Sequence, residues 1–149
     1  MKRYTKDEAL FRLTALCADG EYCTQDMLDK MERWELPEME QAQIMQHLVE
    51  NRYIDDERFC RAFIRDKLFH NKWGRRKIEQ ALYMKRIDKE ISDKFFAEID
   101  DEEILKILRP LIDSKRNSIK AKSDYEMNAK LIRFALQRGF EMDIIQECL

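Results

Sequence analysis

Positively charged side chains at helical spacing are the residues of this sequence best suited to bind another molecule. Arg58, Arg61 and Arg65 follow one another at intervals of three and four positions. On an α-helix this spacing places the three guanidinium groups on one face. We therefore expect them to form a cationic stripe that binds phosphate or carboxylate groups.

A second group of cations surrounds Trp73 and Gly74, at the predicted start of the next helix. The positive end of the helix dipole disfavours a cation there by about 0.3 to 1 kcal/mol, so the position indicates a bound anion or an acidic side chain nearby. Because Tyr22 and Tyr125 occupy the positions equivalent to Trp73 in the repeat described below, we expect its ring to belong to the core. The full set of expected binding cations is Arg58, Arg61, Arg65, Lys72, Arg75, Arg76, Lys77, Lys85 and Arg86.

The sequence offers no group suited to catalysis or to metal binding. Its three glycines are too few and too scattered for a phosphate-binding loop, and His47 and His70 lack the spacing of a zinc site. Asp55, Asp56 and Glu57 are adjacent, so their side chains diverge, and capping of a helix explains them. We expect no cofactor, no metal and no enzymatic activity.

Charge is distributed unevenly along the chain. The formal net charge is −2, but it amounts to −6 over residues 1–56, +7 over 57–89 and −3 over 90–149. A partner responds to the local field within roughly 10 Å at moderate salt. A basic middle between acidic ends therefore predicts contact with an anionic partner at the middle of the chain.

Hydrophobic spacing predicts an all-α fold, since apolar residues recur every three or four positions and no segment alternates as a strand would. The expected helix faces include Ala9, Leu13 and Cys17; Met27 and Met31; Ile44 and Leu48; Phe59, Ala62 and Phe63; Ile78 and Leu82; Ile91 and Phe95; Leu131 and Ala135; and Met142 and Ile145. We expect Asp55 or Asp56 to open the helix of the cationic stripe and Pro110 to break or kink another helix.

A shift of 51 positions aligns large hydrophobic residues with one another, which marks an internal repeat. The aligned pairs are Tyr22 with Trp73, Met27 with Ile78, Met31 with Leu82, Leu36 with Ile87, Ile44 with Phe95 and Leu48 with Ile99. A looser third copy aligns Trp73 with Tyr125, Ile78 with Leu131, Leu82 with Ala135 and Ile87 with Phe140. The sequence thus predicts three tandem three-helix repeats, 1–53, 54–100 and 101–149, forming an elongated array that binds a macromolecule.

Composition also bears on the compartment. No stretch approaches the ~20 apolar residues of a membrane span, and the first residues lack the apolar run of a signal peptide. The four cysteines are scattered without a Cys-x-x-Cys pair. We expect a cytoplasmic protein with reduced thiols and no membrane association.

One part of the sequence is similar to a known family. Four segments, Tyr53-Ile54-Asp55-Asp56-Glu57-Arg58-Phe59, Ala62-Phe63-Ile64-Arg65, Trp73-Gly74-Arg75-Arg76-Lys77-Ile78 and Leu82 to Ile87, resemble the signature of the RecX family of bacterial regulatory proteins. The resemblance singles out Tyr53, Asp55, Asp56 and Phe59, together with Trp73, Gly74 and Ile78, as family-motif residues. Where the family usually has a Lys-Gly-Ile turn, this chain has Lys85-Arg86-Ile87.

The resemblance implies that the repeats form an elongated, curved array that binds the RecA protein and its filament on single-stranded DNA. We expect a monomer. The resemblance also implies inhibition of recombinase, ATPase and co-protease activity in recombinational DNA repair and the SOS response, without a catalytic centre. We expect that changing Arg58, Arg61 and Arg65 to Glu leaves the fold intact and abolishes inhibition of the RecA ATPase. The alternative is a helical protein that binds nucleic acid by itself and competes for single-stranded DNA; its net charge of −2 predicts only weak direct binding.

Overall fold

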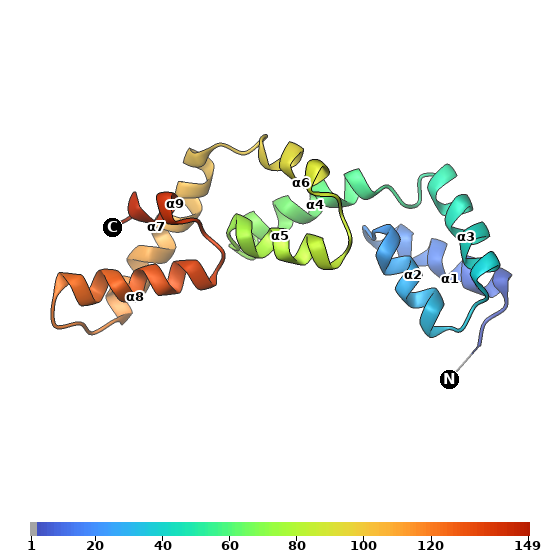
Figure 1. Cartoon of the computed structure of the whole chain (residues 1–149), viewed down its shortest axis with the longest axis horizontal. Coiled ribbons are helices and arrows are strands. Elements are labelled where there is room, and N and C mark those ends of the chain that lie inside the picture. The colour runs from blue at the N-terminus through green and yellow to red at the C-terminus, as the bar shows by residue number, and fades with distance from the viewer. Residues whose placement is uncertain (1–2) are drawn as a thin grey trace. The chain divides into compact units, whose positions relative to one another are not determined.

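The computed structural model describes residues 3–149, and these residues form nine α-helices and no strand (Figure 1). The helices are α1 (Lys6–Asp19), α2 (Thr24–Arg33), α3 (Glu38–Glu50), α4 (Asp56–Phe69), α5 (Arg75–Met84), α6 (Lys89–Phe96), α7 (Asp101–Ser118), α8 (Asp124–Gln137) and α9 (Met142–Gln146). The predicted all-α class is confirmed.

Contacts within the chain divide it into two compact units. Unit 1 contains the residues up to Ala62 together with Lys85–Ile87, and unit 2 contains Phe63–Met84 together with Asp88–Leu149. The boundary falls inside α4, so the first half of this helix belongs to unit 1 and the second half to unit 2. Each unit is described below by itself.

Unit 1 packs α1 and α2 against α3 around one apolar core. The first helix starts with a capping box, in which the Thr5 hydroxyl accepts a hydrogen bond from the Glu8 amide and the Glu8 carboxylate accepts one from the Thr5 amide. The fully buried residues of α1 are Ala9 and Leu13, one helical turn apart. The opposite face of α1 therefore faces solvent.

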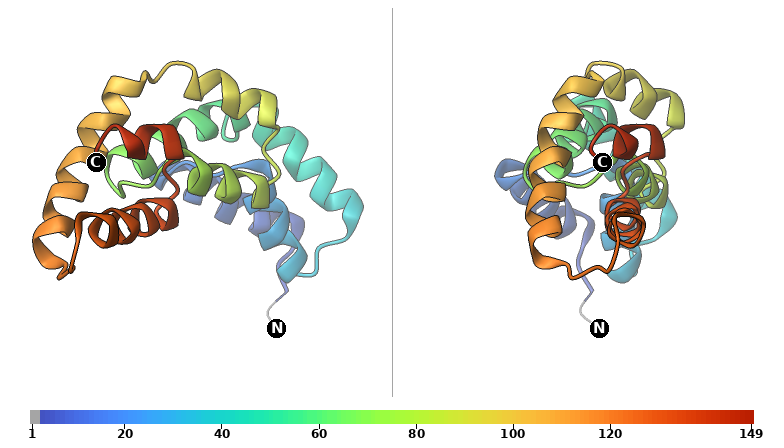
Figure 2. Two further views of the ribbon diagram at one scale, coloured as in Figure 1. Left: turned by 60° about the vertical axis from the view of Figure 1, so that its left-hand side comes forward. Right: turned by 90° about the vertical axis from the view of Figure 1, so that its left-hand side faces the viewer.

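Unit 2 contains a second core, built by α7, α8 and α9, which lie together in both views of Figure 2. A capping box between Asp100 and Glu103 starts α7. The Ser123 hydroxyl accepts a hydrogen bond from the Glu126 amide at the start of α8. These polar contacts satisfy backbone N–H groups that the helices themselves leave without partners.

Burial follows the repeat register found in the sequence. In the first two copies, Met27, Met31, Leu36, Ile44 and Leu48 are buried, and so are their partners Ile78, Leu82, Ile87, Phe95 and Ile99. In the third copy, Leu131, Ala135 and Phe140 are buried. The 51-residue and 53-residue shifts therefore mark equivalent core positions.

Several expected core positions were wrong. Tyr125 is 86% exposed and Trp73 is only half-buried, so this aromatic repeat position is not a core position. Ala62 is exposed, and α4 instead buries the face of Phe59, Cys60, Ile64 and Leu68.

The expected break at Pro110 does not occur, because this residue lies inside α7, which continues to Ser118. Proline removes one backbone N–H, so the carbonyl of Lys106 loses its helical donor. Both residues are exposed, and water can hydrogen-bond this carbonyl without ending the helix.

The turn after the second helix of each repeat has a left-handed residue. Glu35, Arg86 and Gly139 have φ angles of 56°, 57° and 97°, and they occupy equivalent repeat positions. Only glycine adopts such angles without steric cost. Arg86 therefore carries backbone strain, whereas Gly139 at the equivalent position does not.

Replacing Arg86 with glycine should stabilise the protein. Removing the Cβ atom relieves the left-handed strain, and we expect a gain of about 0.5 to 1 kcal/mol in the free energy of unfolding. Urea unfolding followed by circular dichroism measures it. Arg86→Ala removes the same charge but keeps the Cβ atom and should show no gain; an equal gain in both variants would contradict the explanation.

Two glycines allow a close backbone crossing within unit 2. The Gly74 amide donates to the carbonyl of Arg138 at 2.7 Å, and the Arg76 amide donates to the carbonyl of Gly139 at 2.9 Å. A Cβ atom on Gly74 would lie 2.2 Å from the backbone nitrogen of Phe140. The segment before α5 is thus fastened directly to the α8–α9 turn.

Candidate binding surface

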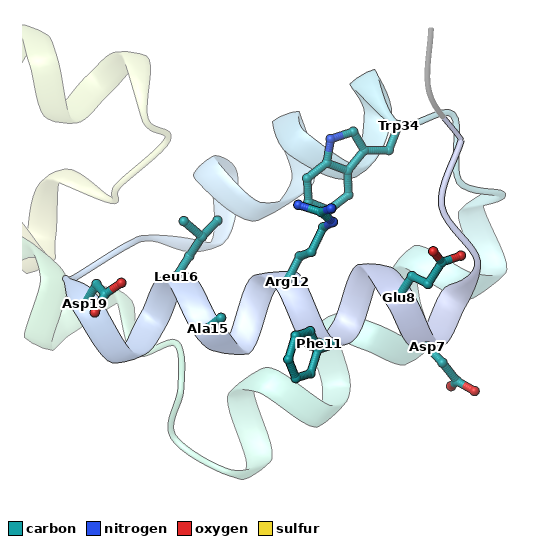
Figure 3. A pocket seen from close by; sticks show the side chains of 8 residues that line it. All are labelled: Asp7, Glu8, Phe11, Arg12, Ala15, Leu16, Asp19 and Trp34. Carbon is teal, nitrogen blue, oxygen red and sulfur yellow. The ribbon is translucent and has the colours of Figure 1, made fainter.

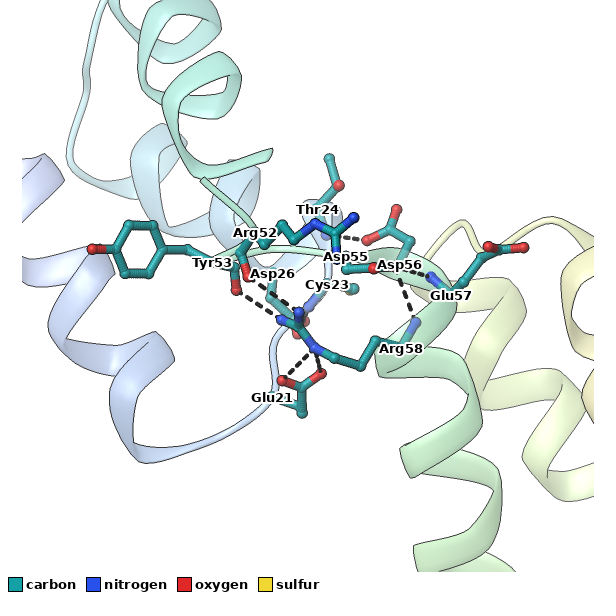
Figure 4. Close-up of polar contacts among 10 residues, drawn as sticks. All are labelled: Glu21, Cys23, Thr24, Asp26, Arg52, Tyr53, Asp55, Asp56, Glu57 and Arg58. Atoms are coloured by element: carbon teal, nitrogen blue, oxygen red, sulfur yellow. Dashed lines mark hydrogen bonds and ion pairs between the residues drawn. The ribbon is translucent and has the colours of Figure 1, made fainter. Parts of the chain in front are cut away.

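The first cation of the predicted stripe, Arg58, is engaged inside unit 1 (Figure 4). Its Nε group donates to both carboxylate oxygens of Glu21, at 2.9 and 2.8 Å, and its two terminal nitrogens donate to the carbonyls of Arg52 and Tyr53. The hydrogen bond with Glu21 holds the pKa of Arg58 above its usual value. Arg58 therefore connects the α1–α2 segment with the α3–α4 segment.

The neighbouring motif acids cap two helices. One oxygen of Asp55 accepts hydrogen bonds from the amides of Glu57 and Arg58, both at 3.1 Å, which opens α4 as expected. Asp56 reaches another helix and accepts from the Thr24 amide, the first residue of α2, at 2.7 Å. The contacts of Arg58, Asp55 and Asp56 together hold the segments of unit 1 to one another (Figure 4).

Lys85 also belongs to unit 1 and is paired. Its ammonium group donates to Asp26 of α2 at 2.7 Å and lies 5.6 Å from the centre of the buried Phe59 ring. Burial raises the pKa of Asp26, whereas the hydrogen bonds from Lys85 and from the Cys23 amide lower it. The lowering effects together outweigh burial, so the pKa of Asp26 lies below its usual value. Lys85 thus positions the turn that follows α5.

Arg75 has three partners in unit 2. Its guanidinium group pairs with Asp93 at 3.0 Å and with Glu79 at 3.5 Å, and it lies 4.6 Å from the centre of the Phe96 ring. Asp93 and Phe96 belong to α6. Arg75 therefore fastens α5 to α6, which resolves the unfavourable position of this cation at a helix start.

Most of the other cations of the predicted set are exposed to solvent. Arg61, Arg65, Lys72, Arg76 and Arg86 are exposed, and Lys77 is half-buried. Within the described part of the chain, the side chains of Lys72, Arg76 and Arg86 contact no acidic group. Lys72, Arg76 and Arg86 therefore present their charge to solvent, whereas Arg58, Arg75 and Lys85 are held by acidic side chains.

Trp73 is the centre of a basic cluster in unit 2. The ammonium groups of Lys67 and Lys77 lie 5.2 and 4.4 Å from the centre of its ring. Lys72 precedes Trp73 directly, Arg76 follows it three positions later, and both are exposed. We call these five residues the Trp73 cluster. Cation–π contact holds the two lysines at the ring, and Lys67 also lies 3.7 Å from the carboxylate of Asp66.

A shallow hollow of about 480 Å³ adjoins the Trp73 cluster. It is lined by Trp73, Lys77, Gln80, Ala81, Tyr83 and Met84. Tyr83 is 79% exposed and Met84 is 76% exposed. An aromatic and apolar surface bordered by cations can contact phosphate groups, acidic side chains and planar rings.

Sequence reasoning missed Lys67, Tyr83 and Met84. The sequence could have indicated Tyr83 and Met84 as exposed. With Ile78 and Leu82 expected in the core, residues 83 and 84 lie outside the buried face of α5. Lys67 had no comparable signal, since its position depends on the turn that brings Trp73 back toward α4. It lies two positions beyond Arg65 on the same helix.

Other chemistry finds no support among the described residues. Residues 3–149 contain no group of three or more potential metal ligands, and no described helix is both long and apolar enough to cross a membrane. The described cysteines form no disulfide, and burial raises the pKa of Cys23 and of Cys60 to about 11. These two thiols therefore stay protonated at neutral pH.

Two domain profiles of one family match the chain. The profile of the second three-helix domain of RecX matches residues 55–94, and the profile of the third three-helix domain matches residues 101–149. Together they include α4, α5, most of α6 and α7 to α9, and residues 95–100 fall outside both matches. The Trp73 cluster lies within the first match.

Curated relatives give the same result. The chain is 29% identical over 135 residues to the regulatory protein RecX of Acinetobacter baylyi, covering 91% of this chain and 82% of that protein. It is 31% identical over 102 residues to RecX of Clostridium botulinum strain Eklund 17B, covering 67% of this chain and 47% of the relative. The chain thus spans about half the length of the clostridial relative. Both are regulatory proteins, in agreement with a non-enzymatic role.

Solved structures show the same fold. One crystal structure of a regulatory protein RecX superposes with a TM-score of 0.87 at 17% identity, covering 96% of this chain and 72% of that chain. RecX from Lactobacillus salivarius superposes with a TM-score of 0.86 at 18% identity, covering 96% and 93%. From the domain profiles, the relatives and the fold together, this chain belongs to the RecX family of regulatory proteins.

Proposed function

We propose that this chain binds RecA and the RecA filament on single-stranded DNA, and that it inhibits the recombinase, ATPase and co-protease activities of RecA. Membership of the RecX family is the observation that carries this proposal. The chain acts without a cofactor, as a monomer in the cytoplasm. Recombinational DNA repair and the SOS response are the processes that this activity affects.

The Trp73 cluster is the proposed contact surface for the filament. It combines exposed cations with an aromatic ring and an apolar hollow, and a RecA–DNA filament offers both acidic protein surface and phosphate. Arg65 belongs to the same unit and is exposed, and the exposed Arg61 and Arg86 of unit 1 are proposed as separate contacts. Arg58, Arg75 and Lys85 act as positioning residues, because acidic partners already hold them.

We also propose the division into repeats 1–53, 54–100 and 101–149. The matches of the second and third RecX domain profiles to residues 55–94 and 101–149 support it. The repeat at equivalent buried positions supports it independently.

Co-sedimentation with RecA filaments, compared with single-stranded DNA alone, tests the proposed function. Binding to DNA alone through Z phosphate contacts should weaken with a log–log salt slope of about −0.7Z. We expect binding to the filament to persist at salt concentrations that release the chain from bare DNA. Absence of the chain from the filament pellet at every salt concentration would contradict the proposal.

The alternative function is direct competition for single-stranded DNA by a nucleic-acid-binding protein. The lysines at the Trp73 ring and the exposed Tyr83 favour it, because bases stack on aromatic rings while cations contact the backbone. It predicts that filament binding and DNA binding decline together as salt rises. The same titration therefore separates the two functions.

A further inference from the structure

Unit 1 has a groove that differs in character from the basic surface of unit 2 (Figure 3). Its volume is about 710 Å³. The lining residues come from α1 and from Trp34, the residue after α2, and they are Asp7, Glu8, Phe11, Arg12, Ala15, Leu16, Asp19 and Trp34. We call it the acidic groove.

Four of the lining residues of the acidic groove form one row along α1. Asp7, Phe11, Ala15 and Asp19 are each four positions apart, and this spacing aligns side chains on one helix face. The row therefore has a carboxylate at each end and apolar residues between them. The small Ala15 leaves room beside the ring of Phe11 for a side chain of a partner.

Phe11 is 75% exposed, although α1 buries Ala9 and Leu13 in the core. Fully burying a phenylalanine side chain contributes about 1.5 to 3 kcal/mol, and this contribution is not used within unit 1. Leu16 and Trp34 extend the apolar surface. The groove therefore has a hydrophobic centre suited to an apolar side chain of another molecule.

The charge of the groove selects among possible partners. Three carboxylates line it against one guanidinium group, and that group, on Arg12, lies 4.5 Å from the centre of the Tyr4 ring. Within residues 3–149, Asp7 and Asp19 have no ion-pair partner. An acidic surface repels the phosphates of DNA, so the complementary partner is a protein segment with cationic and apolar side chains.

We propose that the acidic groove is a second docking site for RecA, in which a basic segment of RecA inserts an apolar side chain beside Phe11. This inference rests on the proposed function and adds a surface to it. Binding then uses two sites of opposite charge: the Trp73 cluster contacts anionic groups of the filament, and the acidic groove contacts a cationic part of the protein. The acidic net charge of the N-terminal segment thereby has a role in recognition.

Substitutions in the row on α1 test the groove. Phe11→Ser removes the apolar contact and Ala15→Gln fills the space beside it. Each should weaken binding to RecA filaments about tenfold, as is typical of a central apolar contact, and leave binding to single-stranded DNA unchanged. Met39→Ser is the matched control, because Met39 is 74% exposed on α3 and lies outside the groove.

The charge of the groove is tested in the same assay. Asp7→Asn combined with Asp19→Asn should weaken filament binding, and the effect should shrink at high salt. Glu38→Gln combined with Glu40→Gln is the control, since both residues are in the first turn of α3 and outside the groove. Circular dichroism verifies that every variant keeps the helical content of the wild type.

The outcomes separate this inference from the proposed function. If wild type binds filaments and the groove variants bind equally well, the docking site is refuted while the proposed function stands. If wild type does not bind filaments, the proposed function itself fails. Analytical ultracentrifugation of the chain alone tests whether the groove instead binds a second copy of the chain. If the wild type self-associates and Phe11→Ser abolishes this association, the inference is overturned.

Discussion

Replacing Gly74 with alanine should destabilise unit 2 by about 4 kcal/mol or more, which exceeds the cost of most single substitutions. The added Cβ atom would lie 2.2 Å from the backbone nitrogen of Phe140 and 2.3 Å from the carbonyl carbon of Gly139. Backbone atoms cannot move aside as a flexible side chain can, so the crossing must open. Two hydrogen bonds, from the amides of Gly74 and Arg76, would be lost with it.

Urea unfolding measures this effect in a background with one tryptophan. The sequence has two tryptophans, so Trp34→Phe leaves Trp73, a residue of unit 2, as the sole fluorescent reporter. Gly20→Ala is the matched control, because the nearest atom to its Cβ would be a ring carbon of Tyr22 at 3.9 Å. Equal unfolding midpoints for Gly74→Ala and Gly20→Ala would show that the crossing does not stabilise unit 2.

Reversing the charge of Lys72 and Arg76 should weaken binding to RecA filaments by about tenfold or more, because repulsion replaces attraction at the proposed contact. The fold should remain intact, since both side chains are exposed and contact no acidic group within the described residues. A carboxylate at position 76 would lie in the first turn of α5, where the helix dipole favours it by about 0.3 to 1 kcal/mol.

Co-sedimentation of Lys72→Glu combined with Arg76→Glu measures this loss. Lys106→Glu combined with Arg133→Glu makes the same change in net charge on α7 and α8, also at exposed positions. Only the first pair should lose binding. Equal losses in the two pairs would mean that net charge alone drives association, which contradicts a local contact at the Trp73 cluster.

The contacts of Arg58 change the effect that we expect from its substitution, because its spacing in the sequence predicted an exposed side chain. A glutamate there would face Glu21 and leave the carbonyls of Arg52 and Tyr53 without their donor. We expect Arg58→Glu to destabilise unit 1 by about 1 to 3 kcal/mol, a range that allows for the 42% exposure of the Arg58 side chain. The triple reversal of Arg58, Arg61 and Arg65 therefore changes stability together with binding.

Hydrophobic spacing predicted the fold well because core burial depends on local periodicity. The shift of 51 positions paired residues that are buried in both copies, such as Met27 with Ile78 and Ile44 with Phe95. It failed at Tyr125, which is 86% exposed, because a repeat position can lose its packing role in one copy. Pro110 does not break α7, because its cost depends on whether solvent reaches the freed carbonyl, and this position is exposed.

The candidate surface was less predictable, because the partner of a charged residue can lie far along the chain. Arg58 pairs with Glu21, and Lys85 pairs with Asp26 across 59 positions of sequence. No local pattern distinguishes such a cation from an exposed one like Arg76. Spacing located the basic segment in the sequence. Only the three-dimensional structure distinguishes the paired cations of this segment from the exposed ones.

The most direct test of the account is the single-stranded-DNA-dependent ATPase activity of RecA, measured as the chain is added. We predict that wild type inhibits this activity in a concentration-dependent manner and that Lys72→Glu combined with Arg76→Glu does not. An ATPase rate that stays unchanged at saturating wild-type chain, or full inhibition by the charge-reversed pair, would contradict the claim that the Trp73 cluster regulates RecA.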